Sequence, residues 1–404
     1  MQHVAFRWVF AGSFASNIGT WMQNVVLISF ADQLTNDASF VGLVTLAQLG
    51  PTLLLAPFGG VLADIANRRI VMMVSAAVQG CLSGVLALVI IGDDPSRGAI
   101  VWCVFGIGIA TAGTVPSATA SMPALVGPSD LAGAVSLNSA QMNASRVFGP
   151  LLVLLPFFDS PSTVFAVNGL TYLFVIIAVG VAPFDGRPAR RAEREGPWTR
   201  FVGGFTAARQ DRIVRTCLVT VSVFSFWSLA FIYQMPGFAR QELGIDRQQF
   251  PLLFGTFGFG AAIGAICVGT LLARVPRTTA VRGGLAGFAA MLAVFALAPN
   301  QPTAFVAVAL CGFAYFVVIT SLSTALQQAV EESVRGRVMG LWMMGWAGLV
   351  PVGSLLAGVA IDRVGHVPVF LVGAAVAAAL IPYASLHADL DDEPRPVEPL
   401  TDAP

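Results

Sequence analysis

The sequence contains no lysine, so its 22 basic residues are all arginine, and they balance 22 acidic residues to a net charge of zero. Charged residues make up 11% of the chain, against roughly 25% in a typical soluble domain. Such sparse, balanced charge gives no electrostatic footprint for a nucleic acid or another polyanion. A phosphate-binding loop of the G-x-x-x-x-G-K type needs lysine, so the motif for direct use of ATP is excluded.

Histidine and cysteine are also scarce, with three and five residues. His3, His366 and His387 fall at predicted helix ends or loops, so we expect no catalytic triad, no metal cluster, no cofactor and no enzyme activity. The cysteines are odd in number and lack paired spacing, which is typical of core residues rather than disulfides. They are Cys81, Cys103, Cys217, Cys267 and Cys311.

Hydrophobic residues, by contrast, make up 56% of the chain, and the mean hydropathy is +0.78. A water-soluble fold cannot hide that much apolar surface, which predicts an integral membrane protein. Because the apolar runs are long and do not alternate, we expect an all-α bundle rather than a barrel. The twelve predicted transmembrane helices lie at 5–33, 38–62, 70–92, 98–120, 131–157, 162–183, 213–238, 249–273, 280–298, 303–328, 336–361 and 368–387.

The arginine positions predict how these helices are oriented. With the N-terminus in the cytoplasm, 17 arginines lie at or beyond the inner ends of the spans and four at the outer ends, while Arg146 lies within a span. This bias predicts a multi-pass protein of the cytoplasmic membrane with both termini in the cytoplasm.

A charged break divides the predicted helices into two sets of six. We expect residues 1–183 to form an N-terminal bundle and residues 213–387 a C-terminal bundle, joined by a cytoplasmic linker at 184–212. Apolar residues at helical spacing in the linker indicate an interfacial helix, and a flexible tether is the alternative. The acidic, proline-rich tail at 388–404 is predicted to be disordered.

Short internal matches suggest that the two bundles arose by duplication. Gly60 and Arg68 close the second predicted helix, and Gly269 and Arg277 close the eighth, at an offset of 209 residues. Parallel six-plus-six repeats are an architecture of secondary transporters, whose substrate site lies between the halves near the membrane midplane. Chance agreement among abundant residue types is the competing explanation.

The loop after the second predicted helix carries the most specific motif. Residues 59–69, GGVLADIANRR, resemble the signature loop of the major facilitator superfamily, G-x-L-a-D-x-x-x-R-R. Stretches at 14–23, 48–57 and 137–150 resemble the branch of bacterial exporters similar to the enterobactin exporter, and the resemblance covers nearly the whole chain. It implies two six-helix bundles that rock in alternating access and export a small amphipathic compound, usually driven by protons.

Within this loop we expect Gly60, Asp64, Arg68 and Arg69 to form a cytoplasmic gate. Gly60 lets two helices approach closely, and Asp64 is an anion that can rest against the positively polarised N-terminus of the eleventh helix. Such contacts are worth about 0.3–2 kcal/mol, enough to bias one state without freezing it. For the two arginines, membrane topology alone is the alternative. The second-half copy has Ala273 in place of Asp64, so a gate there should be weaker.

Arg146 is a charge deep within the fifth predicted helix, about 22 Å from its start at ~1.5 Å per residue. A charge at that depth costs at least about 2.5–3.5 kcal/mol unless it faces a cavity or a partner. It is either a cation that binds an anionic or carbonyl-rich group of the substrate, or a clamp between helices. Gln23 and Asn24 lie at a similar depth on the first helix and are its expected partners, and Asn17 shares a face with Asn24.

Further residues are candidates for the wall of a substrate cavity. They are Thr111 and Thr114 on the fourth helix, Trp227 on the seventh, and Thr320 and Gln327 on the tenth. Small hydroxyls serve equally well as contacts between helices, and an aromatic ring can equally be packed or face lipid.

Asp32 is the carboxylate that lies within the outer part of a predicted helix, near the outer mouth. Together with Asp64 it is a candidate proton site, a role that requires shielding from water. A solvated helix end is the alternative for Asp32.

These features predict a secondary active transporter that exports a small amphipathic molecule, such as a drug, a siderophore or a secondary metabolite, by proton-coupled antiport. The expected partners are that substrate, protons and the lipid bilayer, without nucleic acid, and the chain is expected to act as a monomer. The alternatives are an importer or uniporter on the same fold, and a membrane sensor or scaffold that transports nothing.

Overall fold

The computed structural model describes residues 3–92, 94–127, 129–187, 209 and 211–386, with the side chains at 56–61, 63–64 and 332–334 left aside. This part of the chain is helical, with no strand. The first half contains α1 (Val4–Thr35), α2 (Ala38–Ile65), α3 (Arg68–Val89), α4 (Arg97–Val126), α5 (Leu131–Leu152), the short 3₁₀ helix η1 (Pro156–Phe158) and α6 (Pro161–Val181).

The second half contains two long helices that are interrupted by π-helical turns. The first runs through α8 (Arg212–Val223), η2 (Phe224–Ser228) and α9 (Phe231–Leu243), and the other through α13 (Glu332–Met343), η3 (Met344–Gly348) and α14 (Leu349–Val364). The remaining helices are α10 (Phe250–Gly269), α11 (Arg277–Ala296), α12 (Gln301–Ala329) and α15 (His366–Tyr383).

Ten helical segments of the described chain are long and apolar enough to cross a membrane. The other two long helices are α1 and α5, which fall outside that criterion. The predicted all-α membrane fold is therefore confirmed, with ten of the twelve predicted spans meeting the apolar criterion.

Polar side chains fix where several of these helices begin. The carboxylate of Asp37 accepts a hydrogen bond from the Ser39 N–H at the start of α2, and Asn67 caps α3 in the same way through the Arg69 N–H. Such caps satisfy backbone donors that have no partner within the helix. Helices that pack side by side include neighbours in the sequence, such as α3 and α4, and helices further apart in the chain, such as α2 with α4 and α10 with α12.

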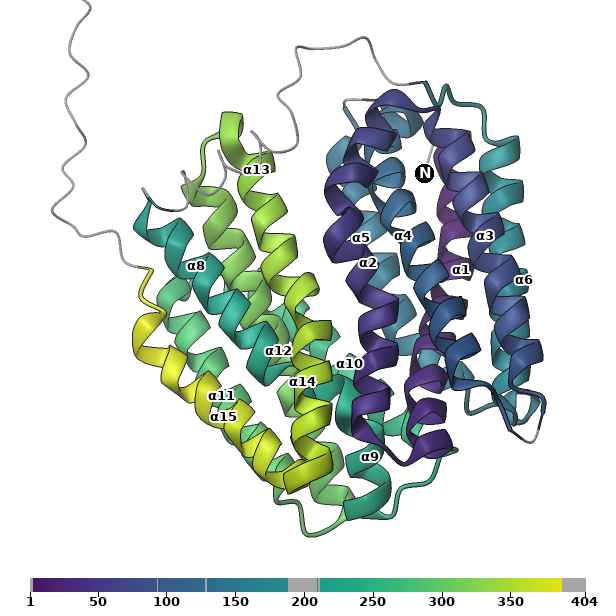
Figure 1. Ribbon diagram of the computed structural model, residues 1–404. Coiled ribbons are helices and arrows are strands. Elements are labelled where there is room, and N and C mark those ends of the chain that lie inside the picture. The colour runs from purple at the N-terminus through teal and green to yellow at the C-terminus, as the bar shows by residue number, and fades with distance from the viewer. Residues whose placement is uncertain (1–2, 93, 128, 188–208, 210, 387–404) are drawn as a thin grey trace, which may run out of the picture.

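The helices form two bundles that lie next to each other (Figure 1), α1–α6 in one and α8–α15 in the other. We call the end that holds the N-terminus and the Arg68–Arg69 loop the arginine end, and the opposite end, where α1 turns into α2, the latch end. The two bundles diverge toward the arginine end and meet at the latch end (Figure 1), where α2 packs against α14 and α9.

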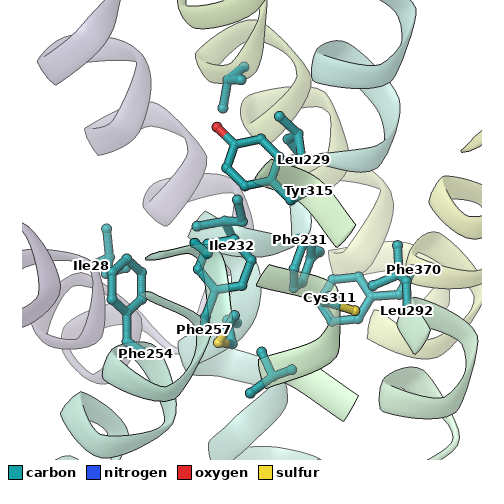
Figure 2. Close-up of a cluster of buried hydrophobic side chains, with 14 of the residues drawn as sticks. Ile28, Leu229, Phe231, Ile232, Phe254, Phe257, Leu292, Cys311, Tyr315 and Phe370 are labelled. Carbon is teal, nitrogen blue, oxygen red and sulfur yellow. The ribbon is translucent and has the colours of Figure 1, made fainter. Parts of the chain in front are cut away.

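The hydrophobic core consists of a cluster that both halves share and a smaller one in the first half. One cluster of buried side chains draws on both halves, and in it Ile28 of α1 lies beside Phe254 of α10 (Figure 2). Around Phe231 the second half adds edge-to-face aromatic pairs with Phe257 and Phe370, at ring distances of 5.9 and 6.0 Å. A separate cluster lies within the first half only. The shared core therefore joins the two halves.

Along α5, the segment nearest the arginine end is not covered by the second half. Val135 and Leu137 are exposed there, and nothing lies within 4 Å of a Cβ built on Gly133. Gly336 of α13, on the opposite bundle, is equally open. Beyond Arg146, in contrast, α5 packs against α10, since a Cβ on Gly258 would lie 3.1 Å from the Arg146 carbonyl oxygen.

Candidate functional site

Arg146 lies between aromatic rings that come from both halves of the molecule. Its guanidinium carbon is 5.2 Å from the ring centroid of Trp21 on α1 and 5.5 Å from that of Phe316 on α12. Both distances are within the range of cation–π attraction, which is worth about 0.5–2 kcal/mol. The side chain thus links the first half to the second at the middle of α5.

No acidic residue pairs with Arg146 within the described part of the chain. Ion pairs in this part of the chain include His3 with Asp130 and Arg240 with Asp32. The Arg146 Nε atom is buried and has no hydrogen-bond acceptor among the described residues. Ring faces attract a cation but do not neutralise it, so the site is electrostatically suited to a negatively charged group.

Two tyrosines complete the surroundings of this cation. Tyr233 of α9 and Tyr315 of α12 lie within electrostatic range of Arg146. The Trp346 ring N–H donates a 3.0 Å hydrogen bond to the Tyr315 hydroxyl, which points away from the apolar cluster below it (Figure 2). The site therefore offers one cation, several ring faces and hydroxyl donors, a combination that fits a planar anion.

The partners predicted for Arg146 are engaged elsewhere. Gln23 is buried and its side-chain oxygen accepts a 2.9 Å hydrogen bond from Asn168 of α6. The side-chain oxygen of Asn24 accepts a hydrogen bond from Gln48 of α2. The predicted association of Gln23 and Asn24 with Arg146 is therefore corrected: both amides join helices within the first half.

Thr111 and Thr114 point to the neighbouring helix α3. The Thr111 hydroxyl donates to the side-chain oxygen of Gln79 at 3.2 Å, and the Gln79 amide donates to Thr114 at 3.2 Å. This geometry favours the packing interpretation of the two threonines over a place on a cavity wall.

The other candidates for the cavity wall differ in how exposed they are. Asn17 and Thr320 are half-buried, and Gln327 is exposed on the same face of α12 as Thr320. Trp227 is 51% exposed on the π-helical turn η2, with its ring edge-on to Phe226. Of the predicted cavity residues, Arg146 is the one that the described contacts bring into a cluster spanning both halves.

The predicted gate lies at the arginine end. The surroundings of Gly60 and the side chain of Asp64 fall outside the described residues. The Arg68 guanidinium donates a 2.7 Å hydrogen bond to the Ala120 carbonyl, and Arg69 donates to the Gly180 carbonyl. These two contacts tie the loop to α4 and α6 of its own half.

Asp32 is not a solvated helix end, so that alternative is wrong. Its side chain is buried because Arg240 of α9 covers it, with the Arg240 Nε 2.8 Å from one carboxylate oxygen and Nη2 3.3 Å from the other. Arg240 also donates to the side chain of Asn36. The pair joins α1 of the first half to α9 of the second.

A further carboxylate, Asp362 at the end of α14, was not among the predicted residues. It accepts hydrogen bonds from the backbone N–H groups of Ala38 and Ser39, at 2.8 and 3.0 Å, across the interface between the halves. A signal for it exists in the sequence, since Gly358–Asp362 reads GVAID and Gly60–Asp64 reads GVLAD. His366 is buried close by, and its Nε2 atom has no hydrogen-bond partner among the described residues.

The fold defined by these two helical bundles is that of membrane transporters. It resembles the nucleoside transporter NupG with a TM-score of 0.79 at 13% identity, over 95% of this chain and 100% of that one. It resembles a bacterial homologue of the human lysosomal transporter Spinster with a TM-score of 0.70 at 14% identity, over 95% of each chain.

The family follows from the sequence match. The model of the "Transmembrane secretion effector" family matches residues 1–395, so the chain belongs to this family of the major facilitator superfamily. Curated relatives include the Staphyloferrin A transporter of Staphylococcus aureus, 23% identical over 90% of this chain and 91% of the relative. Another is the Enterobactin exporter EntS of Escherichia coli O1:K1, 26% identical over 84% of this chain and 81% of the relative. These are transporters, so the chain is not an enzyme.

Proposed function

We propose that this chain is a secondary active transporter that exports a small amphipathic molecule carrying a negative charge, such as a siderophore, a drug or a secondary metabolite. The observation that carries the proposal is Arg146, a cation held by ring faces from both halves with no acidic partner among the described residues. Leaving such a charge uncompensated within a membrane costs several kcal/mol, roughly 2.5 or more. A substrate anion would supply the missing countercharge.

The described structure corresponds to one state of the proposed alternating-access cycle. We place the arginine end in the cytoplasm, in accordance with the excess of arginine there, and the latch end outside. With the halves joined at the latch end, the state described is the one that receives substrate from the cytoplasm. Gly60, Asp64, Arg68 and Arg69 would then close the cytoplasmic side in the opposite state.

Export is supported by the name of one curated relative, the enterobactin exporter, and siderophore cargo by both, which are siderophore transporters. A siderophore with acidic oxygen ligands would suit a site with one cation. The solved relatives support the fold alone, because one of them transports nucleosides.

Protons are the proposed coupling ion, with Asp32 and Asp64 as the sites. Asp32 is shielded by Arg240 in the state described, and separation of α1 from α9 would expose both groups to outside water. The working unit in this proposal is the monomer within the lipid bilayer.

The test is the intracellular accumulation of a compound panel in an exporter-deficient bacterium that expresses the chain. The panel includes fluorescent dyes and a catecholate siderophore, each measured with and without a protonophore. We expect lower accumulation of the anionic members, and this effect should disappear with the protonophore. Raised accumulation would instead establish import, and an unchanged panel with the protein confirmed in the membrane would contradict export of such compounds.

A further inference from the structure

We propose that Asp362 holds the outer side of the transporter closed, together with the Asp32–Arg240 pair, by capping the N-terminus of α2 across the interface between the halves. The inference rests on the proposed alternating access but not on the identity of the substrate. It concerns the latch end, whereas the signature loop of the family lies at the arginine end.

The contact has the geometry of a helix cap supplied by another part of the molecule. One carboxylate oxygen of Asp362 accepts from the Ala38 N–H at 2.8 Å and the other from the Ser39 N–H at 3.0 Å. These N–H groups belong to the first turn of α2, where no carbonyl of the helix can reach them. The positive end of the helix dipole adds to the attraction.

The backbones approach closely at the same place because α14 has a glycine there. A Cβ built on Gly358 would lie 2.3 Å from the Ala38 carbonyl oxygen, a distance that no side chain tolerates. Gln234 of α9 supports the contact by donating to the carbonyl oxygens of Ala38 and Ser354, at 3.1 and 2.9 Å. The start of α2 is thus held by α14 and α9 together.

A second carboxylate makes this contact reversible. Asp37, the residue before α2, accepts from the same Ser39 N–H at 3.3 Å and from the Ser39 hydroxyl at 2.8 Å. When Asp362 moves away, Asp37 remains to cap α2, so opening does not leave the whole helix end without an acceptor.

The sequence places an equivalent carboxylate at the other end of the same pair of helices. Asp64 ends α2 in the motif GVLAD, and Asp362 ends α14 in GVAID. Asp64 is predicted to cap the eleventh helix at the arginine end, and Asp362 caps the second helix at the latch end. In the state closed at the latch end, Asp362 would cap the second helix. In the state closed at the arginine end, Asp64 would cap the eleventh helix.

The experiment measures access with cysteine probes in the full chain, after the five native cysteines are replaced. One probe is Ser29→Cys, because Ser29 is buried between α1 and the second half at the latch end. The other is Ser139→Cys, because Ser139 is exposed on α5 near the arginine end. A membrane-impermeant thiol reagent is added from one side at a time, and its rate of reaction is recorded without substrate. Thermal unfolding of each variant confirms that it is folded.

In this assay Asp362→Asn should raise labelling of Ser29→Cys from the latch side by about three- to thirtyfold, the effect of losing a charged cap at a helix end. Labelling of Ser139→Cys from the arginine side should fall. Asp37→Ala should act in the opposite direction, because it removes the cap that serves the open state. A folded Asp37→Ala protein that labels like Asp362→Asn would overturn the exchange of caps.

Asp246→Asn is the matched control. Its carboxylate also accepts from a backbone N–H at the same end, that of Gln249, but the contact stays within the second half. We expect wild-type labelling for this variant. Wild-type labelling of folded Asp362→Asn would overturn the proposed gate, whatever the export assay shows. Absence of export by the wild-type chain, together with the expected labelling of the variants, would leave the gate intact and count against the proposed function instead.

Discussion

The carboxylate of Asp32 on α1 and the guanidinium of Arg240 on α9 form an ion pair that joins the two halves of the protein, with the closest atoms 2.8 Å apart. The two partners differ in exposure, at 4% for the Asp32 side chain and 33% for that of Arg240. Their removal should therefore have unequal consequences.

Replacing Arg240 should destabilise the protein more than replacing Asp32. Arg240→Gln leaves a buried carboxylate without its countercharge, which we expect to cost about 2–4 kcal/mol. Asp32→Asn leaves a cation that can turn to water, so we expect about 1–2 kcal/mol after allowance for solvent. Thermal unfolding of the purified single and double variants measures both. Equal losses, or a double variant as unstable as the sum of the singles, would contradict the pairing.

The hydrogen bond between Gln23 and Asn168 should stabilise the first half without a role in substrate binding. Both residues are buried, so Gln23→Leu strands the Asn168 amide at a cost of about 1–3 kcal/mol. Asn24→Leu is the control, because its partner Gln48 is half-buried and can reach water. We expect a lower unfolding temperature for Gln23→Leu than for Asn24→Leu, with the substrate Kd unchanged in both. A higher substrate Kd in Gln23→Leu would indicate that Gln23 belongs to the substrate site after all.

The packing of α10 against α12 should depend on Gly260. A Cβ there would lie 1.9 Å from the Ala309 carbonyl oxygen, and backbone atoms cannot move aside as a side chain can. Gly260→Ala should therefore cost at least about 1–3 kcal/mol and reduce the yield of folded protein. Gly269→Ala on the same helix meets nothing within 4 Å and should behave as wild type. Size-exclusion profiles in detergent distinguish the two.

The helices were predictable because apolar runs of this length leave few alternatives in a membrane. The predicted helix at 38–62 corresponds to α2, Ala38–Ile65, whereas the one at 131–157 overran α5, which ends at Leu152. Pro150 and the turn that follows it end that helix early, although the residues remain apolar. Hydropathy alone cannot locate the end of a helix within a run of apolar residues.

Arg146 could be found from the sequence because a charge at that depth needs a partner. Its surroundings could not be, since depth along α1 says nothing about direction. Successive helical residues differ by about 100° around the axis, and Gln23 faces α6 while Trp21 faces Arg146. The contact of Asp32 with Arg240 joins residues 208 apart in the chain and carries no local signal.

The most direct test of the proposed role of Arg146 is transport by everted membrane vesicles that contain the wild-type chain or an Arg146→Gln variant. Uptake of an anionic aromatic compound is compared with that of its neutral ester under an imposed proton gradient. We expect the wild type to take up the anion, and Arg146→Gln to lose about 10- to 100-fold of its apparent affinity for the anion, as a lost charged hydrogen bond implies. Uptake of the ester should be weak in both. Equal uptake of the anion by folded wild type and variant would contradict an anion site at Arg146.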